Sequence, residues 1–317
     1  MHVTEVLSRA TSPLISFEII PPLRGGSVPQ IMEVVEQLIQ FSPPFIDVTG
    51  HSAEVSYEEL PNGTLRRHVK RKRPGTLGLC AAIQSRFGIE AVPHLLCQGF
   101  TREETEDALI ELQYLGIQNV MALQGDDHGY RPAERGDRTR NAFASDLVAQ
   151  IVAMNQGSYL ETLSDAMPTN FCIGVAGYPE KHFTAPNLAR DLAYLKRKVD
   201  AGAHYIVTQM FFDNQAYFDF VQQCREIGIT VPIIPGLKVL SSAKQLRTVP
   251  RTFFVNIPEA FEAEMEEATR PEQMAEIGVA WAVRQCKELL NAGVPCLHFY
   301  VTNNANLVTR VMRQITV

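Results

Sequence analysis

Several features that would mark other classes of protein are missing from the sequence. No apolar run reaches the roughly 20 residues that a membrane-spanning helix needs, and the N-terminus lacks the basic region and hydrophobic stretch of a secretory signal. The six cysteines form no Cys-x-x-Cys pair, and most stand in apolar segments, as buried free thiols in a reducing compartment do. We therefore expect a cytoplasmic protein without a membrane partner.

An excess of positive charge is missing too. The chain has 29 lysines and arginines against 35 aspartates and glutamates, so its net charge of −6 gives no reason to expect nucleic acid as a partner. No Gly-x-Gly-x-x-Gly follows a strand, which argues against a Rossmann dinucleotide site. The composition is otherwise that of a globular protein, because 45% of the 317 residues are hydrophobic. This apolar content suits a large core, and we expect a homo-oligomer.

Short apolar segments alternate with amphipathic helical patterns along almost the whole chain. Most of these segments are continuously apolar, as parallel strands covered on both faces are. The expected strands are Leu14–Ile20, Phe45–Thr49, Ala91–Cys97, Asn119–Leu123, Phe171–Ala176, Tyr205–Met210, Val231–Pro235 and Cys296–Val301. Eight strands with helices between them favour a closed (β/α)8 TIM barrel over an open doubly wound sheet. We expect a single catalytic barrel domain over residues 1–317.

Two stretches depart from this alternation. Residues 51–75 are polar, contain the turn signal Pro61-Asn62-Gly63 and end in a run of basic residues from Arg66 to Arg73. This run could bind nucleic acid, but the acidic chain as a whole favours a solvated, basic loop insertion after the second strand. Residues from about 250 to 290 are helical and charged, and we expect extra helices there before the last strand.

Polar residues stand where the expected strands end, which is where a barrel carries its functional groups. They are Glu18, Thr49, His94, Gly125-Asp126-Asp127, Tyr178, Gln209 and Asn303 or Asn304. Glu18 is the sharpest signal, because a carboxyl group inside a strand pays a desolvation cost that raises its pKa and suits a proton donor. A structural ion pair with a basic neighbour is the alternative for Glu18.

Three further candidates have competing interpretations. Asp126 could cap a loop or bind a metal, but we expect no metal site because the other ligand-rich spacings are absent. His94 and Cys97 have a zinc-like spacing, yet residues three apart on a strand point to opposite faces. Asp191 and Lys198 share one side of a helix and could reach a cofactor. The helix alone favours a Lys198 stem that lies along apolar surface.

Eight segments, taken together, resemble the methylenetetrahydrofolate reductase family. They occur in the family's order and extend from about Leu14 to Asn303, which is nearly the whole chain. The segments are Ser16-Phe17-Glu18 with Pro21-Pro22, Ala91-Val92-Pro93-His94-Leu95, Ala122-Leu123-Gln124-Gly125-Asp126, Tyr178-Pro179-Glu180-Lys181-His182, Leu195-Lys196-Arg197-Lys198-Val199-Asp200-Ala201-Gly202-Ala203, Thr208-Gln209-Met210-Phe211-Phe212-Asp213, Ile234-Pro235-Gly236 and His298-Phe299-Tyr300.

The resemblance implies a (β/α)8 barrel that binds FAD at its mouth and works by ping-pong chemistry in one-carbon metabolism and methionine biosynthesis. NAD(P)H reduces the flavin and leaves, and 5,10-methylenetetrahydrofolate then binds and is reduced to 5-methyltetrahydrofolate. Glu18 would be the general acid that opens the folate ring, and Asp126 would stabilise the positive charge that develops. Gln209 and, as a weaker match, Gln245 would contact folate. Contacts to FAD would come from Thr49, His94, Gln124, Gly125, Asp126, Ala144, Tyr178, His182, Asp191, Arg197 and Lys198.

The sequence departs from the family pattern at three places, one of which is the basic insertion after Thr49, where no flavin contact between residues 51 and 75 can be carried over from the family. Gln124 stands where the family commonly has arginine, and Asn303-Asn304 stands where many relatives have Asn-Arg. The chain also ends soon after the eighth strand, so we expect no C-terminal regulatory domain. The missing charge at Gln124 leaves a rival open, a flavin-free pterin-binding barrel that transfers a one-carbon group. A barrel that binds folate or nucleotide without turnover is a second rival, against which Glu18 and Asp126 both argue.

Overall fold

A computed structural model of the chain describes residues 1–73, 75–132, 139–301 and 304–315. Its parallel strands close into a barrel in the order β1, β10, β9, β8, β7, β6, β5, β2. These eight strands match the expected ones, and their ends differ from the expected ends by at most two residues. The strands are β1 (Leu14–Ile19), β2 (Phe45–Val48), β5 (Glu90–Leu96), β6 (Asn119–Leu123), β7 (Cys172–Gly177), β8 (Tyr205–Met210), β9 (Ile233–Leu237) and β10 (Cys296–Tyr300).

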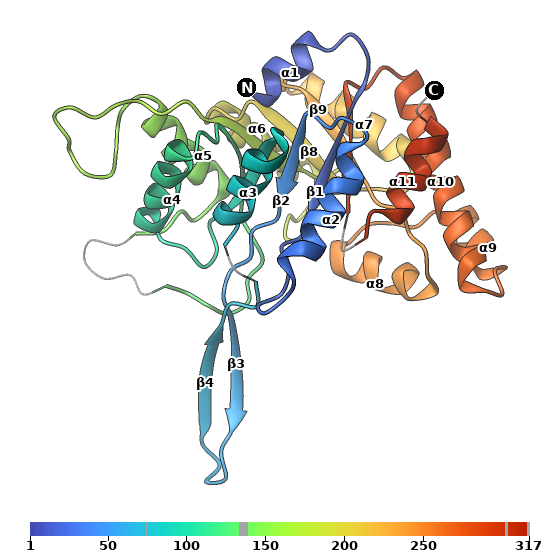
Figure 1. Cartoon of the computed structure of the whole chain (residues 1–317), viewed down its shortest axis with the longest axis horizontal. Coiled ribbons are helices and arrows are strands. Elements are labelled where there is room, and N and C mark those ends of the chain that lie inside the picture. The colour runs from blue at the N-terminus through green and yellow to red at the C-terminus, as the bar shows by residue number, and fades with distance from the viewer. Residues whose placement is uncertain (74, 133–138, 302–303, 316–317) are drawn as a thin grey trace.

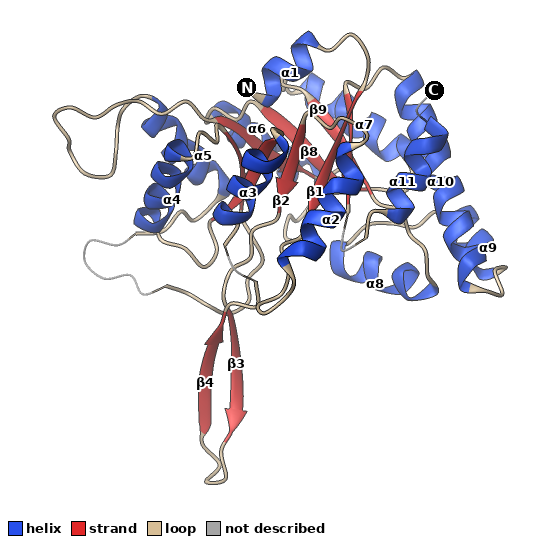
Figure 2. Ribbon diagram, in the orientation of Figure 1, coloured by secondary structure: helices blue, strands red, loops and turns tan. Residues whose placement is uncertain are grey.

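Helices surround this barrel (Figures 1 and 2). They are α1 (Val3–Arg9), α2 (Val28–Ile39), α3 (Leu77–Phe87), α4 (Arg102–Tyr114), α5 (Ala144–Asn155), α6 (Leu188–Asp200), α7 (Asn214–Glu226), α8 (Ala243–Phe253), α9 (Glu259–Glu266), α10 (Pro271–Asn291) and α11 (Asn306–Ile315). The extra helices expected before the last strand are confirmed as α8 and α9, which precede α10. Among the helices of the described residues, none combines the length and the apolar character that a membrane crossing requires.

The alternation of side chains along each strand divides the core in two. One set of residues packs outward against the helices. The other fills the inside of the barrel and includes Phe45, Tyr205 and Ile234, with Val3 and Leu7 of α1 packed against it. Helix α1 therefore closes one end of the barrel, and Figure 1 shows it opposite the end from which β3 and β4 project. The polar residues at the strand ends lie at the other, open end.

The structure corrects the expectation of a loop between β2 and α3. Residues 54–70 form an antiparallel hairpin of β3 (Glu54–Glu59) and β4 (Leu65–Lys70), which stands clear of the barrel (Figure 1). The basic run is offset by acidic residues on the facing strand, because Glu54 pairs with Lys70 and Glu58 with Arg66 in the register. The polar composition of this stretch concealed its strands.

Gly278 marks the place where α10 rests directly on the chain that follows β9. A Cβ atom at Gly278 would overlap the backbone oxygen of Leu240, which is itself fully buried. The helix can therefore approach this segment only because position 278 has no side chain. Gly78 in α3 is a suitable comparison, because a Cβ there would meet no atom within 4 Å.

We expect Gly278→Ala to lower the free energy of unfolding by about 1–3 kcal/mol, the usual cost of overpacking. The loss should occur although alanine is favoured over glycine inside helices by about 1 kcal/mol. The matched variant Gly78→Ala should cause no loss. Urea denaturation of both variants measures the difference, and equal stability changes would contradict the proposed backbone contact.

Candidate functional site

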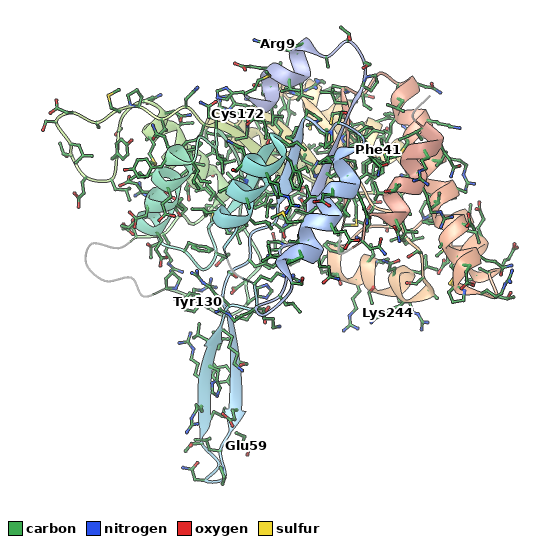
Figure 3. The ribbon with its side chains drawn as sticks, in the orientation of Figure 1. Arg9, Phe41, Glu59, Tyr130, Cys172 and Lys244 are labelled. Atoms are coloured by element: carbon green, nitrogen blue, oxygen red, sulfur yellow. The ribbon has the colours of Figure 1, made fainter. Side chains whose placement is uncertain are left out.

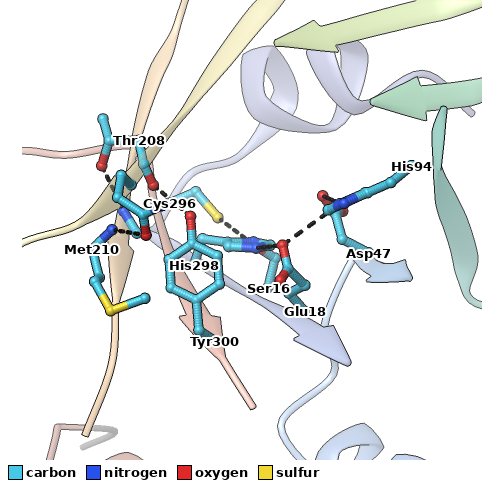
Figure 4. A network of polar contacts seen from close by, with 11 residues as sticks. Ser16, Glu18, Asp47, His94, Thr208, Met210, Cys296, His298 and Tyr300 are labelled. Atoms are coloured by element: carbon cyan, nitrogen blue, oxygen red, sulfur yellow. Dashed lines mark hydrogen bonds and ion pairs between the residues drawn. The ribbon is translucent and has the colours of Figure 1, made fainter. Parts of the chain in front are cut away.

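Strand register brings Glu18 of β1 between two neighbours at the open end of the barrel. Glu18 pairs with Asp47 in β2 on one side and with Tyr300 in β10 on the other. Figure 4 shows the side chains of Glu18, Asp47, His94 and His298 directed toward one another inside the barrel, whereas the Tyr300 hydroxyl donates to Thr208 O. The site is therefore assembled from strands at both ends of the chain.

Glu18 lies beside a histidine that is itself held by an aspartate. His94 Nε2 is 3.5 Å from Glu18 Oε2 and 3.4 Å from Asp47 Oδ2. Burial raises the pKa of Glu18 from its usual 4.5 to about 7, although the nearby His94 partly opposes the shift. Burial also opposes charge on His94, but the hydrogen bond that His94 donates to Asp47 and the charge of Glu18 together raise its pKa. Glu18 thus has the partner of a structural ion pair and the pKa of a proton donor.

His298 is a second histidine in this cluster, and the sequence analysis missed both it and Asp47. His298 Nδ1 is 2.8 Å from Ser16 Oγ, and its Nε2 is 4.0 Å from Glu18 Oε2. Burial lowers the pKa of His298 to about 4, so this ring is neutral at neutral pH. Both residues lie inside apolar segments of their strands, away from the polar strand ends that predict the site.

The carboxylate and imidazole groups of this cluster are of the kinds that bind metal ions. The ligand atoms of Glu18, Asp47 and His298 lie within 4.8 Å of one another. A carboxyl group whose pKa is about 7 would have to lose its proton before it could coordinate an ion at neutral pH. The expectation of no metal site stays a prediction.

The two residues with a zinc-like spacing, His94 and Cys97, point to opposite faces, as strand geometry predicts. His94 faces Asp47 inside the barrel, whereas Cys97 packs in the outer core.

A second group of predicted residues comes together beyond the end of β7. The Asp191 carboxylate accepts a hydrogen bond from His182 N at 2.9 Å, and the rings of Tyr178 and His182 meet edge to face at 4.6 Å. Lys198 Nζ donates to the backbone oxygen of Ala176 and lies 5.9 Å from the centre of the Tyr178 ring. Burial lowers the pKa of Lys198 to about 8, and Asp191 opposes that shift.

This arrangement corrects the interpretation drawn from the helix alone. The Lys198 ammonium group does not remain at the helix surface but reaches the end of β7. Arg197, the next residue toward the N-terminus, is exposed and lies 5.8 Å from the ring of Tyr194. The structure therefore gathers Tyr178, His182, Asp191 and Lys198 and directs Arg197 elsewhere.

Other predicted residues lie around the same end of the barrel. Gln124 follows β6 and donates to Ala142 O at 2.9 Å, while Gly125 adopts a φ of +77° and packs on Leu96. Asp126 is exposed, and Ala144 begins α5 as a buried residue.

The two predicted glutamines make local contacts. Gln209 Oε1 accepts from Met210 N at 2.9 Å, which fixes the orientation of its amide. Gln245 Oε1 accepts from Ser241 N at 2.7 Å, so it ties the start of α8. Asn304 Oδ1 similarly accepts from Asn306 N at 2.7 Å at the start of α11. Asn303 lies outside the described residues.

Two polar groups that follow β2 are available to a ligand. Within the described part of the chain, Thr49 Oγ1 and His51 Nδ1 are buried and have no hydrogen-bond partner. Such atoms usually have a partner in native proteins. His51 and His94 also line a cavity of about 240 Å³ at the foot of the hairpin. A larger hollow of about 420 Å³ lies elsewhere, beside Glu180 and Asp213.

Lys238 is a further residue that the sequence analysis missed. It follows β9 directly, and alternation with the interior residues Ile234 and Gly236 places it on the inner side. Burial lowers the pKa of Lys238, and the charge of Glu18 opposes this shift. A lysine immediately after the apolar segment Ile-Ile-Pro-Gly-Leu was the signal that could have identified it.

Comparison with known proteins agrees with the resemblance. The family model for methylenetetrahydrofolate reductase matches residues 3–316. Methylenetetrahydrofolate reductase (NADH) 1 of Arabidopsis thaliana is 33% identical over 301 residues, which cover 91% of this chain and 46% of the plant protein. The 5,10-methylenetetrahydrofolate reductase of Escherichia coli K12 is 32% identical over 297 residues, which cover 92% of this chain and 87% of the bacterial protein. The chain thus spans about half the length of the plant relatives that it matches.

A solved structure shares the fold. An uncharacterised protein from Clostridium thermocellum, which binds two copies of 5-methyl-5,6,7,8-tetrahydrofolic acid, superposes with a TM-score of 0.58. The match covers 98% of this chain and 96% of the other at 14% sequence identity. At that identity the match shows a shared architecture.

The raised pKa of Glu18 predicts how stability depends on pH. The folded protein holds the Glu18 proton between pH 4.5 and about 7, whereas the unfolded chain has lost it, so Glu18 costs stability as the pH rises through this window. Glu18→Gln removes that cost. The variant should gain up to about 3 kcal/mol over the wild type between pH 4.5 and about 7. Denaturant unfolding across this window measures the difference, and a constant difference would contradict the shift.

Proposed function

Because the chain belongs to the methylenetetrahydrofolate reductase family, we propose that it reduces 5,10-methylenetetrahydrofolate to 5-methyltetrahydrofolate. The electrons would come from NAD(P)H through bound FAD, by a ping-pong mechanism within a single cytoplasmic barrel domain. The observation that carries this proposal is the half-buried Glu18 carboxyl at the mouth, whose pKa of about 7 suits a proton donor at neutral pH.

The residues at the mouth fit an anionic, aromatic cofactor. Lys198 supplies a half-buried cation that can offset the charge of a diphosphate, and Asp191 with His182 fixes the segment that precedes helix α6. The unpartnered Thr49 Oγ1 and His51 Nδ1 can bond to polar atoms of the ring system. When bound, FAD supplies the hydride-transfer chemistry.

The chain's own residues provide the proton and the charge compensation. Protonated Glu18 would donate to the folate nitrogen whose bond to the methylene carbon breaks. The resulting carboxylate would stand 3.5 Å from His94 Nε2, and the raised pKa of His94 favours a positive charge there. Asp126 would place a negative charge near the positive charge that develops on the folate.

Gln209 supports a shared site for the two substrates. An amide can donate and accept hydrogen bonds, so one glutamine can pair with the nicotinamide carboxamide and with the pterin edge in turn. Its oxygen is already held by Met210 N, which leaves the amide group oriented before a substrate arrives. Two substrates that need the same amide cannot bind together, as ping-pong chemistry requires.

A flavin-free pterin-binding barrel that transfers a one-carbon group is the second candidate. Gln124 favours this candidate, because it carries no charge and its amide donates a hydrogen bond to Ala142 O, not to a phosphate. The visible spectrum of the purified protein separates the two. Flavin bands that NAD(P)H bleaches support the reductase, and a colourless protein that still binds folate supports one-carbon transfer.

Glu18→Gln tests the proton donor within one variant. NAD(P)H should still bleach the flavin at close to the wild-type rate, because that half-reaction needs no proton from Glu18. Reoxidation of the reduced protein by methylenetetrahydrofolate should slow by roughly 10²-fold or more, the scale of a lost general acid. Stopped-flow absorbance follows both steps. Wild-type rates in both would show that the role given to Glu18 is wrong.

Lys198→Ala tests the cofactor contact. The variant should bind FAD roughly tenfold or more weakly, because a charge-assisted hydrogen bond is lost, and excess FAD should restore its thermal stability. Lys196→Ala is the matched control, since Lys196 lies on the same helix and pairs with Asp200. Flavin content after gel filtration measures retention. Equal retention by the two variants would contradict the placement of Lys198.

A further inference from the structure

The two faces of the β3–β4 hairpin differ in how their charges are paired. Alternation and register place Glu54, Ser56, Glu58, Arg66, His68 and Lys70 on one face. Both acids of this face have a basic partner, because Glu58 Oε2 lies 2.8 Å from His68 Nε2, and Glu54 forms an ion pair with Lys72, which follows β4. We call it the paired face.

The opposite face consists of Val55, Tyr57, Glu59, Leu65, Arg67 and Val69, and we call it the open face. Tyr57, Leu65 and Val69 are 63%, 65% and 46% exposed, although each is large and apolar. Glu59 and Arg67 have no ion pair with any other described residue. Figure 3 shows side chains standing out from the hairpin, with Glu59 close to its tip.

The hairpin also lacks support from the barrel along most of its length. Its foot is tied, because Arg24 N donates to Lys72 O at 2.7 Å and Val55 N donates to His128 O at 3.1 Å. Beyond the foot it stands alone (Figure 1). An isolated two-stranded hairpin is marginally stable in water and exposes its unpaired edges. A third surface that covers the open face would bury its exposed apolar side chains and so stabilise the hairpin.

Charge decides which partner fits. Residues 54–70 contain three glutamates and three lysines or arginines, so the two strands and their turn are neutral when His68 is neutral. The basic surplus, Arg71 to Arg73, turns back to the barrel, where Arg73 donates to Pro21 O and Arg71 lies 5.1 Å from the Phe100 ring. A neutral hairpin gives little attraction to nucleic acid or to anionic lipid.

We propose that the open face binds the open face of a second copy of this chain. The face carries one acid and one base beside three exposed apolar residues, so it is complementary to itself, as the surface of a two-fold dimer must be. Because the hairpin stands clear of the barrel (Figure 1), two hairpins can meet while the barrels stay apart. This inference is independent of the proposed function.

Charge reversal in trans tests the proposal. Arg67→Glu leaves the open face with two acids, and Glu59→Arg leaves it with two bases, so each variant should self-associate roughly tenfold or more weakly than the wild type. An equimolar mixture of the two variants should recover the wild-type assembly, because an open face with two acids then meets an open face with two bases. A change confined to one chain cannot produce that recovery. Arg66→Glu on the paired face is the control and should keep the wild-type molar mass.

Light scattering coupled to gel filtration at micromolar concentration measures each mass. Single variants that keep the wild-type mass, or a mixture that keeps the mass of the separate variants, would overturn the proposal. So would a wild-type chain that is monomeric alone and shifts only when RNA is added, because the partner would then be nucleic acid. Unfolding of the variants is checked by circular dichroism. A folded pair that recombines only as a mixture supports the two-fold contact.

Discussion

Closure of the barrel between β1 and β10 is the constraint on which the site depends. It joins Ser16 to His298 across 282 positions of sequence and places Tyr300 beside Glu18. On its other side β1 pairs with β2, which supplies Asp47. If the sheet were open at this point, Glu18 would stand on an edge strand in contact with water, and burial would no longer raise its pKa. The acidity of one side chain therefore follows from the topology of the whole sheet.

The same burial affects the two neighbouring histidines differently because their partners differ. His94 lies against two carboxyl groups, and their combined effect exceeds the cost of burial and raises its pKa. His298 is bonded through Nδ1 to the neutral hydroxyl of Ser16, and although the charge of Asp47 raises its pKa, burial outweighs this effect and the pKa falls to about 4. His94 can therefore carry the positive charge that balances a deprotonated Glu18, while His298 stays neutral.

The strands and the position of Glu18 could be predicted because both leave a local signal. Buried parallel strands are apolar throughout, and a carboxyl group within one of them is conspicuous. Asp47 and His298 also interrupt apolar segments, but their importance depends on which strands become neighbours, and that is decided by closure. The reach of Lys198 to the end of β7 could not be read from helix periodicity, because it depends on where the helix packs. The β3–β4 hairpin was not predicted, because its strands are held together by pairing with each other and are not buried, so they lack the apolar pattern of the barrel strands.

Burial moves the pKa values of Glu18 and Lys198 toward each other, to about 7 and about 8. Each shift weakens the charged form, and each is opposed by a partner of opposite charge: His94 for Glu18 and Asp191 for Lys198. A ligand that fills the mouth removes more water, so it strengthens the shift wherever it brings no charge of its own. An uncharged ring beside Glu18 would thus keep the carboxyl protonated at the moment a proton is needed. An anionic group beside Lys198 would do the opposite and keep the ammonium group charged. The two ends of the mouth are therefore suited to different parts of a ligand, one ring-like and neutral, the other anionic.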